Sequence, residues 1–159
     1  MAGGLFIQVI MLALRGTGDV LTLKTWAVQS VGSTFSAYAK PTTSDEWLRP
    51  DYPPVAILVL SSAARVGEWI EPSIEIQSRL LTVLIKIPVM ASRACLVWIL
   101  YLVARRSGST VESARLIALS LWLNPALVVN GPALGYFDAL CWSFGVLALL
   151  LAGLGHPIG

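Results

Sequence analysis

Apolar and polar stretches alternate along this chain of 159 residues. Five apolar stretches, dominated by Leu, Ile, Val and Ala, predict helices. They cover residues 3–14, 55–66, 80–104, 116–129 and 140–154. The last two carry almost no charge, which is typical of transmembrane helices. We therefore predict an all-α fold, a polytopic bundle of transmembrane helices in a single domain over residues 1–159.

A long polar stretch, Gly16–Pro54, separates the first two apolar stretches and forms the predicted outer loop over residues 16–54. Part of it, residues 20–39, places apolar residues at three- or four-residue steps, which gives a helix one apolar face. These are Val20, Leu23, Ala27, Val31, Phe35 and Tyr38. The spacing predicts one or two amphipathic helices lying along the membrane surface, with Trp26 at the level of the lipid headgroups. An ordinary helix within a loop would have the same spacing.

Composition supports a membrane protein. Hydrophobic residues make up 56% of the chain and charged residues 13%, with a mean hydropathy of +0.75. Soluble domains carry about 25% charged residues. No basic cluster is interleaved with aromatic residues, which excludes nucleic-acid binding. Cys95 and Cys141 lie within apolar stretches and are interpreted as small apolar residues, and the single histidine, His156, supports neither a metal site nor a Ser–His pair.

Positive charge predicts the orientation in the membrane. Arg105, Arg106 and Arg115 flank the short connection 105–114, which the positive-inside tendency places in the cytoplasm. The next stretch then runs outward, so that Asp138 lies at the outer face. The same tendency places Arg65, at the end of the second stretch, in the cytoplasm.

A single crossing cannot join two cytoplasmic positions, Arg65 and Arg105. We therefore expect a break near Pro88, because proline removes a backbone donor and tends to kink or end a helix. The break would create two spans, residues 69–87 and 89–104. Alternatively, residues 55–66 enter the membrane without crossing it. Both interpretations leave Asp19, Asp51 and Asp138 on the same side of the membrane.

Acidic residues are scarce, with 9 Asp and Glu among 159 residues. Three of them, Asp19, Asp51 and Asp138, lie where apolar stretches meet polar ones. Carboxylates at such positions indicate a functional site at the membrane face. Asp19 follows two glycines that permit a sharp turn, and its carboxylate could act as a general base or simply cap the helix that follows.

Other polar residues also have two interpretations. Lys86 lies among apolar residues and either pairs with an anionic group, such as a lipid phosphate, or extends to the headgroups, as does Arg93. The segment Asp51-Tyr52-Pro53-Pro54 either shapes a site or only fixes the start of a helix. Asn124-Pro125 predicts a kink with a freed carbonyl. Asp138 follows a turn at Gly135 and is either a cap or a site residue.

The ordered set of these motifs resembles the N-terminal half of integral-membrane glycosyltransferases of the GT-C superfamily. It is most similar to the mannosyltransferases that use polyprenyl-phosphate or dolichyl-phosphate sugars. The motifs are Gly18-Asp19, Asp51-Tyr-Pro-Pro54, Leu84-Ile-Lys86-Ile-Pro88, Leu123-Asn-Pro125, Asn130-Gly131 and Gly135-Tyr-Phe-Asp138.

The resemblance implies inverting transfer of a hexose from a lipid-phosphate donor to a hydroxyl of an unidentified glycan, lipid or protein acceptor. Asp19 matches the catalytic base of the first outer loop. The positions matched to substrate binding are Asp138, Lys86 facing the donor phosphate, Asp51 and Tyr52 shaping the cavity, and Trp26. No metal and no cofactor beyond the lipid-linked sugar is expected. The site would lie at the outer or lumenal face of a multi-pass protein, in the bacterial plasma membrane or in the endoplasmic reticulum.

The chain departs from the family in two respects. Tyr136 stands where the family usually carries Gln, which affects a polar contact. Family members are also longer and have further spans, so the resemblance implies an incomplete N-terminal portion. Two alternatives remain at this point, a transporter or flippase component and a truncated, non-catalytic pseudoenzyme.

Overall fold

The computed structural model describes residues 2–33, 36–39 and 50–155, and every regular element in those ranges is helical. The elements are α1 (Ala2–Leu12), α2 (Gly18–Gln29), α3 (Ser36–Ala39), α4 (Pro54–Ile70), α5 (Arg79–Arg106), α6 (Val111–Trp122), α7 (Pro125–Val128), the π-helical turn η2 (Val129–Ala133) and α8 (Asp138–Gly155). The predicted all-α class is confirmed for these ranges. Part of the predicted outer loop, residues 34–35 and 40–49, and His156 lie outside them.

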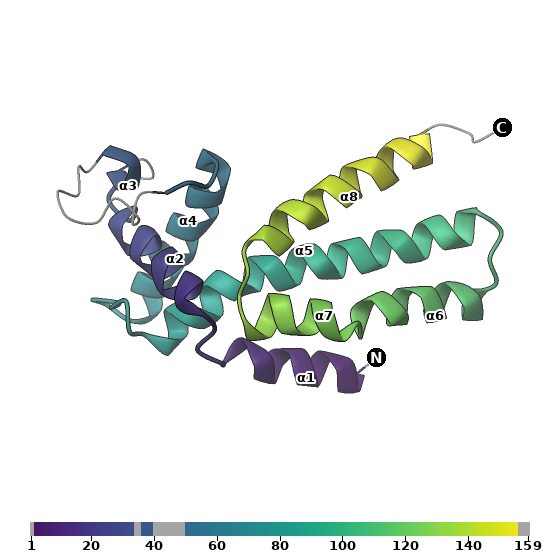
Figure 1. Cartoon of the computed structure of the whole chain (residues 1–159), viewed down its shortest axis with the longest axis horizontal. Coiled ribbons are helices and arrows are strands. Elements are labelled where there is room, and N and C mark those ends of the chain that lie inside the picture. Colours follow the sequence, from purple (N-terminus) through teal and green to yellow (C-terminus); the bar gives the residue numbers. More distant parts are fainter. Residues whose placement is uncertain (1, 34–35, 40–49, 156–159) are drawn as a thin grey trace.

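The longest helix, α5, runs through both halves of the molecule (Figure 1). Its first part packs with α2 and α4. Its second part lies between α8 on one side and α6 on the other, while α1 packs against η2. The ends of α1 and η2 and the starts of α2 and α8 therefore meet near the middle of the molecule, far from the turn between α5 and α6.

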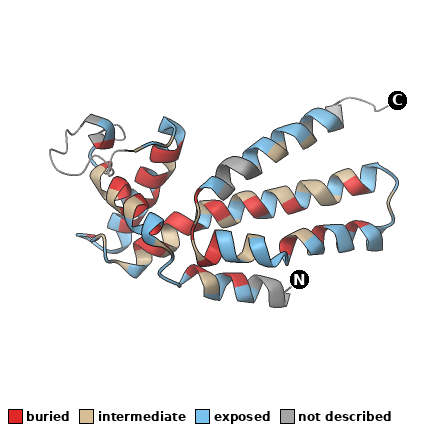
Figure 2. Ribbon diagram, viewed as in Figure 1, coloured by how far each residue is buried: buried red, intermediate tan, exposed pale blue. Residues whose placement is uncertain are grey.

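The buried core is uneven (Figure 2). A continuous cluster fills the region of α2, α4 and the first part of α5, and it consists of Leu23, Trp26, Ala27, Ala56, Ile57, Leu60, Ala63, Ala64, Ile74, Leu81, Ile85, Val89 and Phe137. Between the distal part of α5 and α6 the buried cluster is only Val97, Ala118 and Trp122. Large apolar side chains are exposed nearby, including Phe6, Trp98, Leu116 and Leu149.

Within the described residues, α5 is long and apolar enough to cross a membrane. The pair formed by α6 and the segment Pro125–Ala133 reaches the same length and apolarity only when taken together, with a bend of 48° at the break. Asn124 produces that break, because its side chain accepts hydrogen bonds from the backbone N–H groups of Ala126 and Leu127 and starts a new helix at Pro125. The predicted kink is confirmed.

The predicted break near Pro88 is wrong, because α5 continues through it without interruption. Packing explains why the helix tolerates the proline: Ile85 and Val89, on either side of it, are both buried in the larger core cluster. The guanidinium Nε of Arg65 donates to the carbonyl oxygen of Val31 at 3.2 Å, so Arg65 joins α4 to the segment after α2.

The predicted amphipathic helix after Asp19 exists as α2, but its apolar face packs against protein. Trp26 is only 3% exposed, so its ring lies in the core rather than among headgroups. Lys24 is also buried, and its Nζ donates to the carbonyl oxygen of Ser78 at 3.0 Å and to the hydroxyl of Thr82 at 3.1 Å. Burial lowers the pKa of Lys24. In these residues α2 is an ordinary packed helix.

Candidate functional site

Asp19, Asp51 and Asp138 line one cavity of about 430 Å³. Tyr52 and Trp26, the other two residues assigned to a cavity by resemblance, line it as well. The remaining walls come from Thr22, Leu23, Tyr136 and Phe137. The structure thus brings together, from three separate segments, all the predicted site residues except Lys86.

Helix periodicity places the α2 residues on this wall. Asp19, Thr22 and Trp26 are three and four residues apart, so they lie on the same side of the helix. Asp19 is in the first turn of α2, whereas the N-cap residue is Thr17. The interpretation of Asp19 as the N-cap is therefore wrong, although a carboxylate in the first turn still interacts favourably with the helix dipole.

Two glycines allow the chain to pass closely under the cavity. Gly16 and Gly135 have positive φ angles of 81° and 75°. A Cβ atom on either residue would lie 2.6 Å from Cγ2 of Val20. The backbone N–H of Thr17 donates to the carbonyl oxygen of Leu134 at 3.3 Å. These contacts hold the starts of α2 and α8 together, and with them Asp19 and Asp138. Gly18, by contrast, has nothing within 4 Å of a built Cβ and makes no sharp turn.

Tyr52 connects the walls of the cavity. Its hydroxyl donates to Oδ1 of Asp138 at 2.8 Å. Its ring makes edge-on contacts with Trp26 at 5.9 Å and Phe137 at 6.0 Å between centroids. The hydroxyl of Tyr38 in turn donates to the backbone carbonyl of Tyr52 at 2.5 Å. The segment before α4 is thereby fixed against the start of α8.

The local charge is negative. Burial raises the pKa of Tyr52 well above its usual value, and the hydrogen bond to Asp138 and the charges of Asp138, Asp51 and Asp19 raise it further. Tyr52 therefore stays protonated and donating at neutral pH. Burial and the charge of Asp51 also raise the pKa of Tyr38. Among the described residues that line the cavity there is no Lys or Arg, so its carboxylates favour ligands that carry hydroxyl groups or positive charge.

Lys86 lies outside the cavity. It is fully buried, and its Nζ donates to the carbonyl oxygens of Leu14 at 2.7 Å and Ala133 at 2.9 Å. Both carbonyls are at helix C-terminal ends, where a cation is favourable. The predictions that Lys86 faces a donor phosphate or extends to the headgroups are therefore corrected: this ammonium joins the end of α1 to the end of η2.

A second cavity, of about 690 Å³, adjoins the first. Tyr136 and Asp138 line both cavities. The remaining lining residues come from α5, the end of α6, α7, η2 and α8. Most are apolar: Val89, Arg93, Leu96, Leu100, Leu121, Leu127, Asn130, Gly131, Val146 and Leu150. We call this the apolar groove. It leads from the acidic cavity along the surface of the second part of α5.

Arg93 is buried rather than extended to the headgroups. Its guanidinium donates to the carbonyl oxygens of Leu121 and Trp122 at the end of α6, and lies 5.4 Å from the centroid of the Trp122 ring. It also contacts the side chain of Gln8 at 3.5 Å, and Gln8 itself donates to the Trp122 carbonyl at 3.1 Å. Sequence reasoning missed Gln8, whose signal was a lone amide within an otherwise apolar stretch.

No group of three or more His, Cys, Asp or Glu side chains in the described ranges is placed to hold a metal ion. The three acids share a cavity without forming such a group. Comparisons of the chain with protein-family models, with curated proteins and with solved structures find no match.

Proposed function

We propose that these residues form the catalytic face of an integral-membrane glycosyltransferase, which transfers a hexose from a polyprenyl-phosphate donor to an acceptor hydroxyl. The observation that carries the proposal is the junction at Asp138 and Tyr136, where an acidic cavity opens into an apolar groove. A lipid-linked sugar needs both environments side by side. The polar sugar fits the cavity and the polyprenyl chain fits the groove.

The arrangement of charge along α5 supports a membrane orientation for this site. The acids lie at one end of the helical layer, and Arg105 and Arg106 lie at the end of α5. Between Lys86 and Arg106 the helix spans about 30 Å, the thickness of the hydrocarbon core. We propose that α5, the bent α6–η2 segment and α8 cross the membrane, with the arginines in the cytoplasm and the acids at the outer face.

Asp19 is the proposed general base. Its carboxylate takes the proton of the acceptor hydroxyl while that oxygen attacks the anomeric carbon. The bond from the anomeric carbon to the phosphate oxygen breaks, and the polyprenyl phosphate leaves with the electron pair. This single displacement inverts the anomeric configuration. Asp138, held by Tyr52, and Asp51 hold sugar hydroxyls by accepting hydrogen bonds.

The test is an assay of the full 159-residue chain in lipid vesicles with polyprenyl-phosphate mannose as donor. Asp19→Asn should lower the transfer rate about 100-fold or more, since a general base contributes 10²- to 10⁴-fold. Asp51→Asn removes the same charge from the same cavity and should cost less than Asp19→Asn. Glu112→Gln, in the first turn of α6 and outside the cavity, is the matched control and should retain full activity. Full activity of Asp19→Asn would overturn the proposed role.

A second measurement distinguishes transfer from transport. Single cysteines at positions 19 and 138, in a background lacking Cys95 and Cys141, should react with a membrane-impermeant thiol reagent from the outer face only. Reaction from both faces would instead indicate alternating access, as expected for a transporter.

A further inference from the structure

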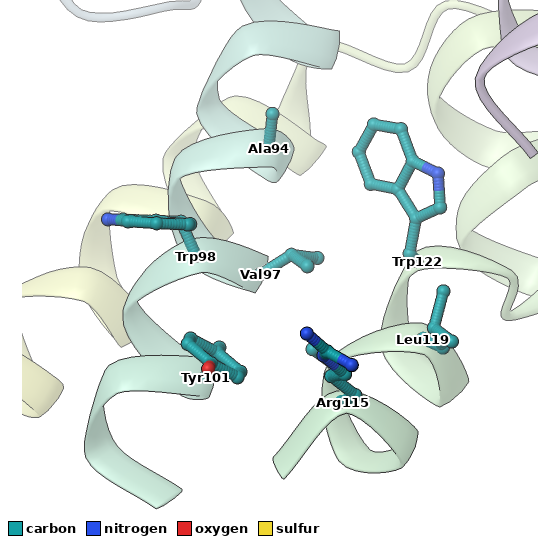
Figure 3. Close-up of a pocket in the computed structure, with 8 residues that line it drawn as sticks. Ala94, Val97, Trp98, Tyr101, Arg115, Leu119 and Trp122 are labelled. Carbon is teal, nitrogen blue, oxygen red and sulfur yellow. The ribbon is translucent and has the colours of Figure 1, made fainter. Parts of the chain in front are cut away.

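A third cavity lies between α5 and α6, away from the acidic site. Its volume is about 540 Å³, and its lining residues are Ala94, Val97, Trp98, Tyr101, Arg115, Ala118, Leu119 and Trp122. We call it the α5–α6 groove. Figure 3 shows Val97 on α5 and Arg115 on α6 directed into the space between the two helices, while the ring of Trp98 points away from α6. Alanines on both helices leave this space open, and the lining is apolar except for Arg115 and the polar atoms of the aromatic rings.

Arg115 gives the groove a charged end. Figure 3 shows its guanidinium reaching from α6 into the space between the helices. Within the described part of the chain no Asp or Glu lines the groove, and Glu112, in the first turn of α6, is not among its residues. The turn that joins the helices adds the exposed Arg105 and Arg106, so positive charge gathers at this end of the groove.

The positions along the helices match a lipid headgroup and its acyl chain. Arg115 and Tyr101 are four and five residues from the helix ends at Val111 and Arg106, roughly 6–8 Å along the axis. Trp98 lies one turn deeper and is 62% exposed. Aromatic side chains favour this interfacial depth, and basic pockets between helices on the cytoplasmic side recognise anionic headgroups.

We propose that the α5–α6 groove binds one anionic phospholipid of the cytoplasmic leaflet. Its phosphate contacts Arg115, with Arg105 and Arg106 adding long-range attraction, and one acyl chain lies along Val97 and Trp122. The volume falls within the roughly 300–1,000 Å³ of small-molecule sites, which favours a single lipid over a protein partner. The inference rests on the membrane embedding proposed above and is independent of sugar transfer.

The experiment measures tryptophan fluorescence of the full chain in vesicles that contain brominated phosphatidylglycerol or brominated phosphatidylcholine. Because bromine quenches by contact, excess quenching by the anionic lipid reports a bound anionic lipid beside Trp98 and Trp122. Trp98→Phe should lower this excess, which assigns the signal to the groove. We expect Arg115→Gln to weaken the preference about fivefold, since each Arg near the surface contributes about 1 kcal/mol.

Two further variants complete the test. Arg79→Gln removes an exposed arginine at the opposite end of α5 and should keep the preference. Ala94→Leu fills the groove from an exposed position without changing charge and should abolish the excess quenching while helicity by circular dichroism stays unchanged. Equal quenching by the two lipids, or an undiminished preference in Arg115→Gln, would overturn the lipid site. Absence of quenching by either lipid would instead overturn the embedding, whereas loss of sugar transfer alone affects only the proposed enzyme.

Discussion

Two regions of the molecule differ in how far they bury their apolar residues. The first consists of α2, α4 and the first part of α5, and the second consists of the rest of α5 together with α6, α7, η2 and α8. In the first, one continuous core buries thirteen residues. In the second, the buried cluster among the described side chains has three residues, and many large apolar side chains face outward (Figure 2). The first region resembles a water-soluble helical cluster, although α4 also exposes Val55 and Trp69, while the second suits a lipid environment.

Buried cations show a second difference. Lys86, where the two regions meet, and Arg93, inside the second, both bind backbone carbonyls at helix ends. The acids, in contrast, lie exposed at the edge of the first region. Helix breaks thus supply ligands for cations inside the molecule, whereas the three carboxylates of the acidic cavity lie exposed at its surface, that of Asp138 accepting the hydrogen bond from Tyr52.

The most damaging change to the junction should be Lys86→Met. Methionine retains much of the packing volume but leaves the buried carbonyl oxygen of Ala133 and the part-buried one of Leu14 without this donor. We expect a loss of about 3 kcal/mol or more in the free energy of unfolding, measured by chemical denaturation followed by near-ultraviolet circular dichroism. Arg79→Gln, which removes an exposed cation from the same helix, should change it by less than about 0.5 kcal/mol. Equal losses of unfolding free energy in Lys86→Met and Arg79→Gln would show that the hydrogen bonds of Lys86 do not stabilise the junction between the two regions.

Arg93→Met tests the second region and should cost less, about 2 kcal/mol. Each carbonyl then keeps one donor, since the backbone N–H of Asn124 donates to Leu121 at 3.3 Å and the side-chain amide of Gln8 donates to Trp122. The double variant with Gln8→Leu should lose more than the sum of the single variants, since both then leave the same carbonyl unpaired. Additive losses in the same unfolding experiment would contradict this shared role.

Gly135→Ala tests the close approach under the cavity. A methyl group there meets Val20 at 2.6 Å, and the positive φ adds strain, so we expect a loss of about 1–2 kcal/mol. Gly18→Ala, with open space and no positive φ, should leave the free energy of unfolding unchanged or slightly raised. Both variants are measured by thermal unfolding. An equal loss of stability in the two would show that the close approach at Gly135 does not restrict the side chain there.

Tyr52→Phe should have the smallest effect, about 1 kcal/mol, through the lost hydrogen bond to Asp138. Folding raises the pKa of Tyr52 above its ordinary value of about 10, so its contribution is complete below that pH and is lost as pH rises above it. Unfolding measured between pH 8 and pH 11 should therefore show a steeper loss of stability in the unchanged protein than in Tyr52→Phe. If stability falls equally steeply with pH in both proteins, the ionisation of Tyr52 is not linked to folding.

The helices could be predicted from apolar stretches, and so could the kink at Pro125, because these depend on local sequence. The grouping of Asp19, Asp51 and Asp138 followed from placing segment ends on one side of a membrane. The course of α5 through Pro88 was mispredicted, because packing on Ile85 and Val89 outweighs the local penalty of proline. The partners of Lys86 and Arg93 could not be predicted, since backbone carbonyls carry no sequence signature.

The uninterrupted course of α5 through Pro88 fixes the separation between the acidic cavity and the arginine-bearing turn. In a bilayer whose hydrocarbon core is thinner than about 30 Å, the helix must tilt, which inclines the mouth of the cavity away from the membrane normal. In a thicker bilayer the lipids must thin locally, or the carboxylates are drawn towards the acyl chains. On the proposed membrane orientation, the length of the acyl chains in the host bilayer therefore becomes a variable that sets how a substrate would reach Asp19.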